Sequence, residues 1–155
     1  MKKISIEKDD LSDGKVAELL REHHQEMFLY SPAESIHALD LTHLNDSDLT
    51  FWRAECDGIF AGCGAIKALS HQHAEIKSMR TVKSFLRQGV AARILEELLK
   101  EASARGYQQV SLETGTHQAF APAIALYKKF GFKVCGPFGD YQEDPYSMFM
   151  TVELG

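Results

Sequence analysis

Short apolar runs and helix-like apolar stripes alternate along the chain, and this order predicts a mixed α/β protein. Ile4 and Ile6 mark a first short strand. Behind Ser12, which we expect to cap the helix, apolar residues recur at helical spacing as far as Met27. A second helix is predicted to begin at Ser31–Glu34, because Ser-Pro-Ala-Glu places a capping residue, a proline and a glutamate in the order of a capping box.

The middle of the chain is predicted to be extended. Leu49–Cys56 and Ile59–Ala68 flank Asp57-Gly58, the kind of two-residue sequence that is most typical of a hairpin turn. Residues 74–82 should form a further strand. Gly62-Cys63-Gly64 lies inside the hairpin and opens no helix, which favours a packing or bulge feature over a dinucleotide-binding loop.

Two helices and three strands are predicted in the second half of the chain. One helix covers about residues 89–104, where one face is apolar and Gly106 is placed to end it. A strand follows at 108–114. The last helix begins near Pro122, carries Tyr127 and ends at Gly131, before closing strands at 132–135 and 146–152. We expect residues 1–155 to form a single domain without repeats or linkers.

The segment at the start of the 89–104 helix is a candidate anion-binding site. Its sequence is Arg87-Gln88-Gly89-Val90-Ala91-Ala92. Small residues let the main chain approach a ligand closely, and the N–H groups and positive dipole end of a helix favour phosphate or pyrophosphate. Gly89 is not followed by Lys and Ser/Thr, which argues against a P-loop phosphotransferase.

Composition narrows the possible partners and locations. The 155-residue chain is 45% hydrophobic and 25% charged, and its formal net charge of −5 argues against a nucleic-acid binder. We find no long apolar run and no secretory leader, so we expect a cytoplasmic protein without a membrane partner. Three cysteines without C-x-x-C spacing suit reduced thiols, and His71-x-His73 lacks the further ligands of a metal site, so no metal is expected.

Three local motifs give the chain a definite resemblance. They are Glu75-Ile76-Lys77-Ser78-Met79, Gln88-Gly89-Val90-Ala91 and Ala125-Leu126-Tyr127-Lys128-Lys129-Phe130-Gly131-Phe132. In this order and spacing they resemble GNAT-superfamily N-acetyltransferases, and the segments at 112–115, 137–141 and 147–150 resemble the bacterial YsnE-like subgroup. The resemblance implies the GNAT fold, a mixed but mostly antiparallel sheet of six to seven strands flanked by about four helices. It also allows a homodimer.

The resemblance further implies that acetyl-CoA is the co-substrate. The residues implied for its binding comprise the backbone of Met79, Arg80 and Thr81 for the pantetheine arm, and Arg87, Gln88, Gly89, Val90, Ala91 and Ala92 around the pyrophosphate. Leu86 departs from the family pattern, which has Gln or Arg three residues before the glycine. Phe120 departs where many members carry Asn. Each departure puts one side-chain contact in doubt.

The same resemblance implies acetyl transfer from the thioester to an amine. Tyr127 occupies the family position whose hydroxyl meets the coenzyme sulfur, so it is the candidate acid. Glu75 is the candidate base, with an ion-pair role as its alternative, and His117 or a water chain is the runner-up base. His117 also suits a loop residue that caps nearby backbone. Candidate acceptor-binding residues are Tyr30, Glu113, His117 and Tyr141.

These inferences predict an N-acetyltransferase that acts on an amine of a small molecule or a peptide. The alternative is a CoA-binding regulatory module that has kept the anion site without turnover. Tyr127 at the acid position favours the enzyme.

Overall fold

A seven-stranded sheet forms the centre of the molecule in the computed structural model, which describes residues 3–33 and 47–154. The strand order is β1-β2-β3-β4-β5-β7-β6, and every neighbouring pair is antiparallel except β4 and β5. The strands span Ile4–Asp9 (β1), Leu49–Cys56 (β2), Ile59–Ala68 (β3), His73–Thr81 (β4), Gln109–Gly115 (β5), Lys133–Cys135 (β6) and Ser147–Glu153 (β7).

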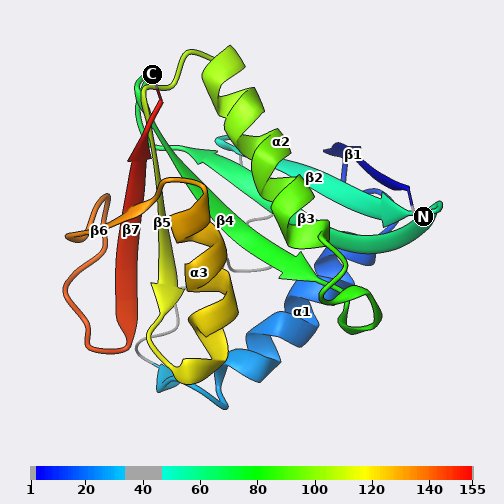
Figure 1. Cartoon of the computed structure of the whole chain (residues 1–155), viewed down its shortest axis with the longest axis horizontal. Helices are drawn as coiled ribbons and strands as arrows, with labels where there is room; N and C mark the ends of the chain where they lie inside the picture. Colours follow the sequence, from blue (N-terminus) through cyan, green and yellow to red (C-terminus); the bar gives the residue numbers. More distant parts are fainter. Residues whose placement is uncertain (1–2, 34–46, 155) are drawn as a thin grey trace.

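Helices cover both faces of this sheet. Figure 1 shows α2 (Val90–Ala104) and α3 (Ala121–Lys129) in front of the sheet and α1 (Lys15–Met27) behind it. Two short 3₁₀ turns, η3 (Lys83–Phe85) and η4 (Gln118–Phe120), precede α2 and α3. The predicted mixed, mostly antiparallel sheet is confirmed. The helix predicted from Ser31 onward falls largely on residues 34–46, which lie outside the described residues.

Two apolar cores hold the layers together. On the front face, the buried stripe of α2 packs with residues of β2 to β5 and with Tyr127 and Phe132. On the back face, Val16, Leu19 and Leu20 of α1 pack on residues of β2 and β3. Burial of each such aliphatic side chain contributes about 1.5–3 kcal/mol, so amphipathic helices are stable where they cover the sheet.

Glycines shape the hairpin of β2 and β3 at two places. The turn residues Asp57 and Gly58 both have positive φ, 52° and 83°, as a two-residue type I′ turn requires. Within β3, a Cβ on Gly64 would lie 2.8 Å from Ile94 Cγ2 of α2. The helix therefore approaches the strand closely because Gly64 has no side chain, which confirms the packing interpretation of Gly62-Cys63-Gly64.

The start of α1 differs from the prediction. Gly14, in the left-handed conformation, is the N-cap residue, and α1 begins at Lys15. Ser12 was expected at the N-cap, but its amide instead donates to Asp10 Oδ1 at 3.0 Å, within a turn. Asp13 Oδ1 accepts from the Lys15 amide at 3.1 Å. The acidic turn before the helix thus replaces the serine cap.

The three cysteines are free thiols, as the sequence predicts. Cys56 and Cys63 are buried free thiols, and Cys135 is a half-buried one. Burial raises the pKa of the Cys63 thiol to about 12. Within the described ranges, every helix is too short or too polar to cross a membrane.

Candidate active site

The central strands β4 and β5 separate part-way along their length. Their parallel ladder has only three residue pairs, from His73↔Gln109 to Glu75↔Ser111. Beyond Glu75 the two strands diverge, as Figure 1 shows, while β4 stays paired with β3 as far as Thr81. Backbone amides need hydrogen-bond partners, and an extended ligand that carries amides can supply them along such an edge.

A β-bulge interrupts β4 at Ser78 and Met79, where the segment predicted to contact pantetheine begins. The register with β3 moves from Cys63↔Arg80 to Ala65↔Lys77, so Ser78 and Met79 together oppose Gly64. Ser78 takes a positive φ of 58°. Bulges twist a strand locally and re-aim the residues beside them. The bulge therefore lies in the part of β4 that has separated from β5.

The residues predicted to bind an anion form the turn that leads into α2. Arg87 and Gly89 have positive φ values of 63° and 87°, and α2 begins at Val90 without a side-chain cap. Alternating right- and left-handed residues point successive N–H groups into one concavity. The first turn of α2 contains no acidic residue, and a Cβ on Gly89 would meet nothing within 4 Å. These features suit an anion that sits against the backbone.

Tyr127 is held by the structure that ends α3. Gly131, with φ of 95°, ends the helix, and its amide donates to the Lys128 carbonyl while the Phe132 amide donates to the Tyr127 carbonyl. This is the hydrogen-bond pattern of a Schellman motif, which often brings the two flanking apolar side chains together. The Tyr127 and Phe132 rings meet edge to face at 5.9 Å. The Tyr-x-x-x-Gly-Phe sequence therefore has a structural reason.

The Tyr127 phenol lies in an environment that keeps it protonated. The residue is buried in the front core. Burial, together with the negative charge of Glu113, raises the pKa of Tyr127 to about 12. At neutral pH the hydroxyl is therefore a proton donor, which a catalytic acid requires.

Glu75 is buried and interacts with two other polar side chains. Its Oε2 accepts a hydrogen bond of 2.6 Å from the Tyr141 hydroxyl and lies 3.3 Å from Lys77 Nζ. Lys77 Nζ also donates to the Tyr141 oxygen at 2.9 Å. Burial and the negative charge of Glu75 raise the pKa of Tyr141 far above its usual range. The ion-pair alternative for Glu75 thus has direct geometric support.

The loop after α1 meets the loop after β5. The Tyr30 ring lies 4.7 Å from the His117 ring and 6.0 Å from that of Phe120. His117 Nδ1 accepts a hydrogen bond of 2.9 Å from the Ala119 amide. A neutral imidazole that accepts at Nδ1 carries its proton on Nε2, so it has no second lone pair to offer as a base. The backbone-capping role of His117 has this support.

Arg80 ties the end of β4 to α1. It forms an ion pair with Glu26, whose other oxygen lies 3.2 Å from Lys83 Nζ. Burial, followed by the positive charge of Arg80, lowers the pKa of the neighbouring His23 to about 4. The side chain of Arg80 is thus engaged with α1, so its predicted contribution to ligand binding comes from its backbone.

Comparison with known proteins supports the resemblance. Residues 15–132 match the family model described as "Acetyltransferase (GNAT) family". The chain belongs to the GNAT acetyltransferase family. It is also 52% identical over 149 residues to the uncharacterized N-acetyltransferase YsnE of Bacillus subtilis strain 168, which covers 96% of this chain and 99% of the relative. The predicted family and enzyme class are confirmed.

Solved structures have the same fold as this GNAT acetyltransferase. A structure assigned as an acyl-CoA N-acyltransferase from Klebsiella pneumoniae superposes with a TM-score of 0.83 at 27% identity, covering 98% of each chain. A GNAT family acetyltransferase from Elizabethkingia anophelis, solved with acetyl-CoA bound, has a TM-score of 0.72 at 18% identity and covers 97% of this chain and 98% of its own.

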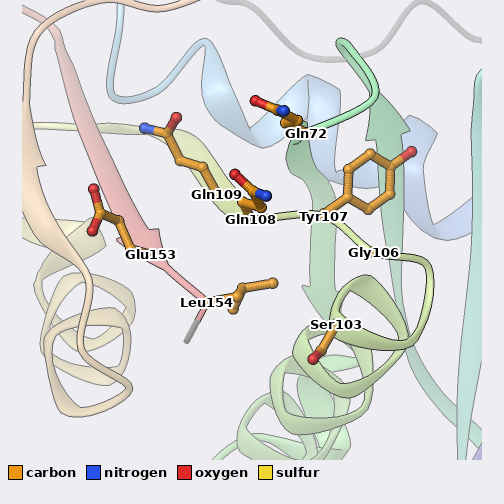
Figure 2. Close-up of a pocket in the computed structure, with 8 residues that line it drawn as sticks. All are labelled: Gln72, Ser103, Gly106, Tyr107, Gln108, Gln109, Glu153 and Leu154. Carbon is orange, nitrogen blue, oxygen red and sulfur yellow. The ribbon is translucent and has the colours of Figure 1, made fainter.

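A pocket at the opposite end of this GNAT protein is unsuited to the anionic cofactor of the family. It has a volume of about 560 Å³, and its lining includes Glu153 but no lysine or arginine. Figure 2 shows its three glutamines, which are Gln72, Gln108 and Gln109. Tyr107 follows the C-terminal end of α2, whereas the predicted anion site lies at its N-terminal end. Figure 2 labels the full lining, which consists of Gln72, Ser103, Gly106, Tyr107, Gln108, Gln109, Glu153 and Leu154.

The GNAT fold brings some of the predicted residues together and keeps others apart. Glu75 meets Tyr141, and Tyr30 meets His117, whereas Tyr127 is part of the core on the other side of the sheet. Lys77 lies in the motif Glu75–Met79, but no role was predicted for it. On a strand, residues two positions apart lie on the same face, so the spacing of Glu75 and Lys77 already indicates an ion pair. Within residues 3–33 and 47–154, no cluster of three metal-ligating side chains occurs.

Proposed function

We propose that this GNAT acetyltransferase moves an acetyl group directly from acetyl-CoA to an amine. The observation that carries the proposal is the separation of β4 from β5 next to an uncapped helix N-terminus. Acetyl-CoA combines an amide-bearing arm with a pyrophosphate, so it needs a free strand edge and an anion site side by side. The separated part of β4 can supply the strand edge, and the turn before α2 can supply the anion site.

The proposed cofactor contacts follow from that arrangement. The backbone of Met79, Arg80 and Thr81 would pair with the pantetheine amides, because this part of β4 has left the ladder with β5. The turn and first helical residues, Gln88 to Ala92, would hold the pyrophosphate through their N–H groups. Arg87, which is exposed beside the turn, would add a positive charge. Leu86 is 53% exposed and offers no polar contact.

The proposed chemistry requires one proton to be removed and one to be supplied. An alkyl ammonium with a pKa near 10.4 is almost wholly protonated at neutral pH, and its deprotonation costs roughly 4–5 kcal/mol. Tyr127 would protonate the departing thiolate, because its phenol is buried and protonated. A backbone N–H near Met79 would stabilise the oxyanion. Glu75, directly or through water, would accept the proton from the amine, whereas the capping hydrogen bond of His117 disfavours that runner-up.

The acceptor would be an amine of a small molecule or a peptide. The Tyr30 and His117 rings meet in a tilted contact at the junction of two loops, and Tyr141 reaches the sheet face that carries Glu75. These residues, with Glu113, remain the proposed acceptor-binding set. A cytoplasmic location and a homodimer remain predictions.

A thiol-release screen with acetyl-CoA tests this function. Purified protein is assayed over amino acids, polyamines, aminoglycosides and short peptides, and acetyl-CoA binding is measured by calorimetry on the same sample. We expect binding and amine-dependent release of coenzyme A. Binding without release over the whole panel would contradict the transfer function and favour a regulatory module, whereas absence of binding would contradict the cofactor site itself.

A further inference from the structure

The thiol of Cys63 lies directly behind the bulge of β4. Cys63 belongs to the Gly62-Cys63-Gly64 segment of β3 and is completely buried in the back core. Its thiol donates a hydrogen bond of 3.3 Å to the carbonyl oxygen of Ser78. Ser78 is the bulge residue with a positive φ. The contact therefore joins a buried side chain to the point where β4 departs from regular strand geometry.

A positive φ at Ser78 needs support from its surroundings. For a residue with a Cβ this conformation is strained, and it persists only where neighbouring groups hold it. Two neighbours on β3 do so from opposite faces of the sheet. In front, Gly64 leaves space for Met79, whose Sδ lies 3.0 Å from the position that a Cβ of Gly64 would take. Behind, the Cys63 thiol holds the Ser78 carbonyl.

The Ser78 carbonyl and the Met79 amide belong to the same peptide group. That group is planar and trans, so its C=O and N–H bonds point in opposite directions. Because Cys63 holds the carbonyl, the Met79 N–H is turned away from the Cys63 sulfur. This N–H belongs to the part of β4 that has separated from β5, where the proposed cofactor arm would bind.

The Cys63 thiol keeps its hydrogen at neutral pH. Burial, followed by the negative charge of Asp9, raises the pKa of Cys63 to about 12, against an opposing effect of Arg80. Cys63 is therefore a lasting hydrogen-bond donor to Ser78, and it takes up no proton during acetyl transfer.

We propose that Cys63 is a positioning residue that, through the Ser78 carbonyl, directs the Met79 N–H at the acetyl carbonyl of the bound cofactor. This inference rests on the proposed acetyl transfer from acetyl-CoA. As the amine attacks, negative charge develops on the thioester oxygen, and an N–H that is already fixed stabilises this charge without reorienting. Loss of the thiol loosens the peptide group but leaves the proposed pyrophosphate contacts at α2 unchanged.

Two substitutions separate the hydrogen bond from simple packing. Cys63→Ala removes the donor and keeps an apolar side chain, whereas Cys63→Ser keeps a donor. Using the best amine from the thiol-release screen, we expect Cys63→Ala to lower kcat by about 10-fold with unchanged affinity for acetyl-CoA, and Cys63→Ser to retain most of the activity. Packing alone predicts the reverse order, because alanine suits an apolar core better than serine.

A matched control is available on the neighbouring strand β2. Cys56 is also a buried free thiol, but it packs in the front core and lies outside the bulge. Cys56→Ala should therefore leave kcat unchanged. Urea denaturation of each variant confirms that it is folded, and the comparison of the wild type with Cys63→Ala stands on its own if a buried serine unfolds the other variant.

Infrared spectroscopy tests the direction of the N–H without an acceptor amine. A hydrogen bond to the thioester oxygen lowers its carbonyl stretching frequency, which difference spectra report when acetyl-CoA is labelled with ¹³C at the acetyl carbonyl. We expect a lowered frequency in the wild type and in Cys63→Ser. In Cys63→Ala the frequency should return toward that of free acetyl-CoA.

The outcomes separate this inference from the function on which it rests. The same kcat and carbonyl frequency in the wild type and Cys63→Ala would overturn the positioning role while leaving acetyl transfer intact, and so would equal losses of activity in both Cys63 variants. A carbonyl frequency that depends on Cys63, without release of coenzyme A over the whole amine panel, would support the positioning role and contradict the transfer function.

Discussion

The position of Tyr127 shows how one side chain is placed by local backbone chemistry. Gly131 and Phe132 close the end of α3, and the Phe132 ring packs against the tyrosine three residues before the helix cap. The phenol is thereby held with little rotational freedom in a buried environment. A catalytic acid benefits from both properties, since its proton must be present and its direction fixed.

Replacement of Tyr127 by Phe tests the acid role. The Tyr127→Phe variant keeps the ring and its packing on Phe132 but cannot protonate the thiolate. We expect kcat to fall by about 10²–10⁴-fold while the affinity for acetyl-CoA is unchanged. Stopped-flow thiol release and calorimetry measure the two quantities. Unchanged turnover would remove Tyr127 from the mechanism, and Phe132→Leu serves as a packing control that retains the hydroxyl.

Among the elements, α2 links the proposed anion site to the centre of the sheet. Its N-terminus follows the Arg87–Gly89 turn, and its buried stripe packs on β3, where Gly64 permits close approach. The bulge in β4 lies opposite the same glycine. The position of α2 on β3 therefore determines where the proposed anion site lies relative to the free edge of β4.

The charge at the start of α2 can be altered without a steric clash inside the fold. Gly89→Glu places a carboxylate where a Cβ meets open space, so it should repel the pyrophosphate and abolish measurable acetyl-CoA binding. Gly89→Ala has the same positive φ, with a strain of about 1–2 kcal/mol, but adds no charge. Calorimetry should detect binding to the alanine variant. Normal affinity in Gly89→Glu would refute the anion site.

The packing of α2 on β3 predicts a destabilising substitution. A Cβ on Gly64 would lie 2.8 Å from Ile94 Cγ2 and 3.0 Å from both Leu98 Cδ1 and Met79 Sδ. Gly64→Ala should therefore lower the free energy of unfolding by about 1–3 kcal/mol through overpacking. Gly136→Ala is the control, since a Cβ there meets nothing within 4 Å. Urea denaturation that gave the same stability for both variants would contradict the close approach.

Across the whole molecule, charged side chains connect the helix behind the sheet to the end of β4. Glu26 of α1 pairs with Arg80 at the end of β4 and with Lys83 of η3. His23, one turn earlier on α1, is largely buried beside them. The charge state of this cluster thus affects how well α1 stays docked on the sheet.

Acid should weaken the fold through His23. Burial and Arg80 lower its pKa in the folded protein from 6.5 to about 4, with Glu26 opposing and His24 adding to the decrease. Between these two values the unfolded chain binds a proton that the folded protein does not, so stability is lost as pH falls below 6.5. From pH 7.5 to pH 5 the loss is about 2 kcal/mol.

Urea titrations of His23→Leu check this contribution. The variant removes the titrating group but keeps an apolar side chain, so its stability should change less between pH 7.5 and pH 5 than that of the wild type. His24→Leu, at the neighbouring position of α1, is the control and should retain the wild-type slope. Equal pH dependence in wild type and His23→Leu would contradict the prediction.

Most of the elements could be predicted because their signals are local. Asp57-Gly58 adopts the predicted turn, and Gly106 and Gly131 both end helices with positive φ. The Ser12 cap was wrong for an equally local reason, since Asp10 and Asp13 supplied competing acceptors. The acidic side chains beside Ser12 determined how the turn before α1 is hydrogen-bonded. The preference of serine for the N-cap position was too weak to predict this.

The sequence by itself was enough to predict the order of the described strands and helices, the family, and the glycine turn before α2. These depend on periodicity, capping and glycine conformations, which act over a few residues. Only the tertiary structure decided which groups meet. Tyr141 reaches Glu75 across 66 positions of sequence, and the ladder between β4 and β5 stops just before Glu113. Such contacts arise from strand order and loop packing together, so no local pattern encodes them.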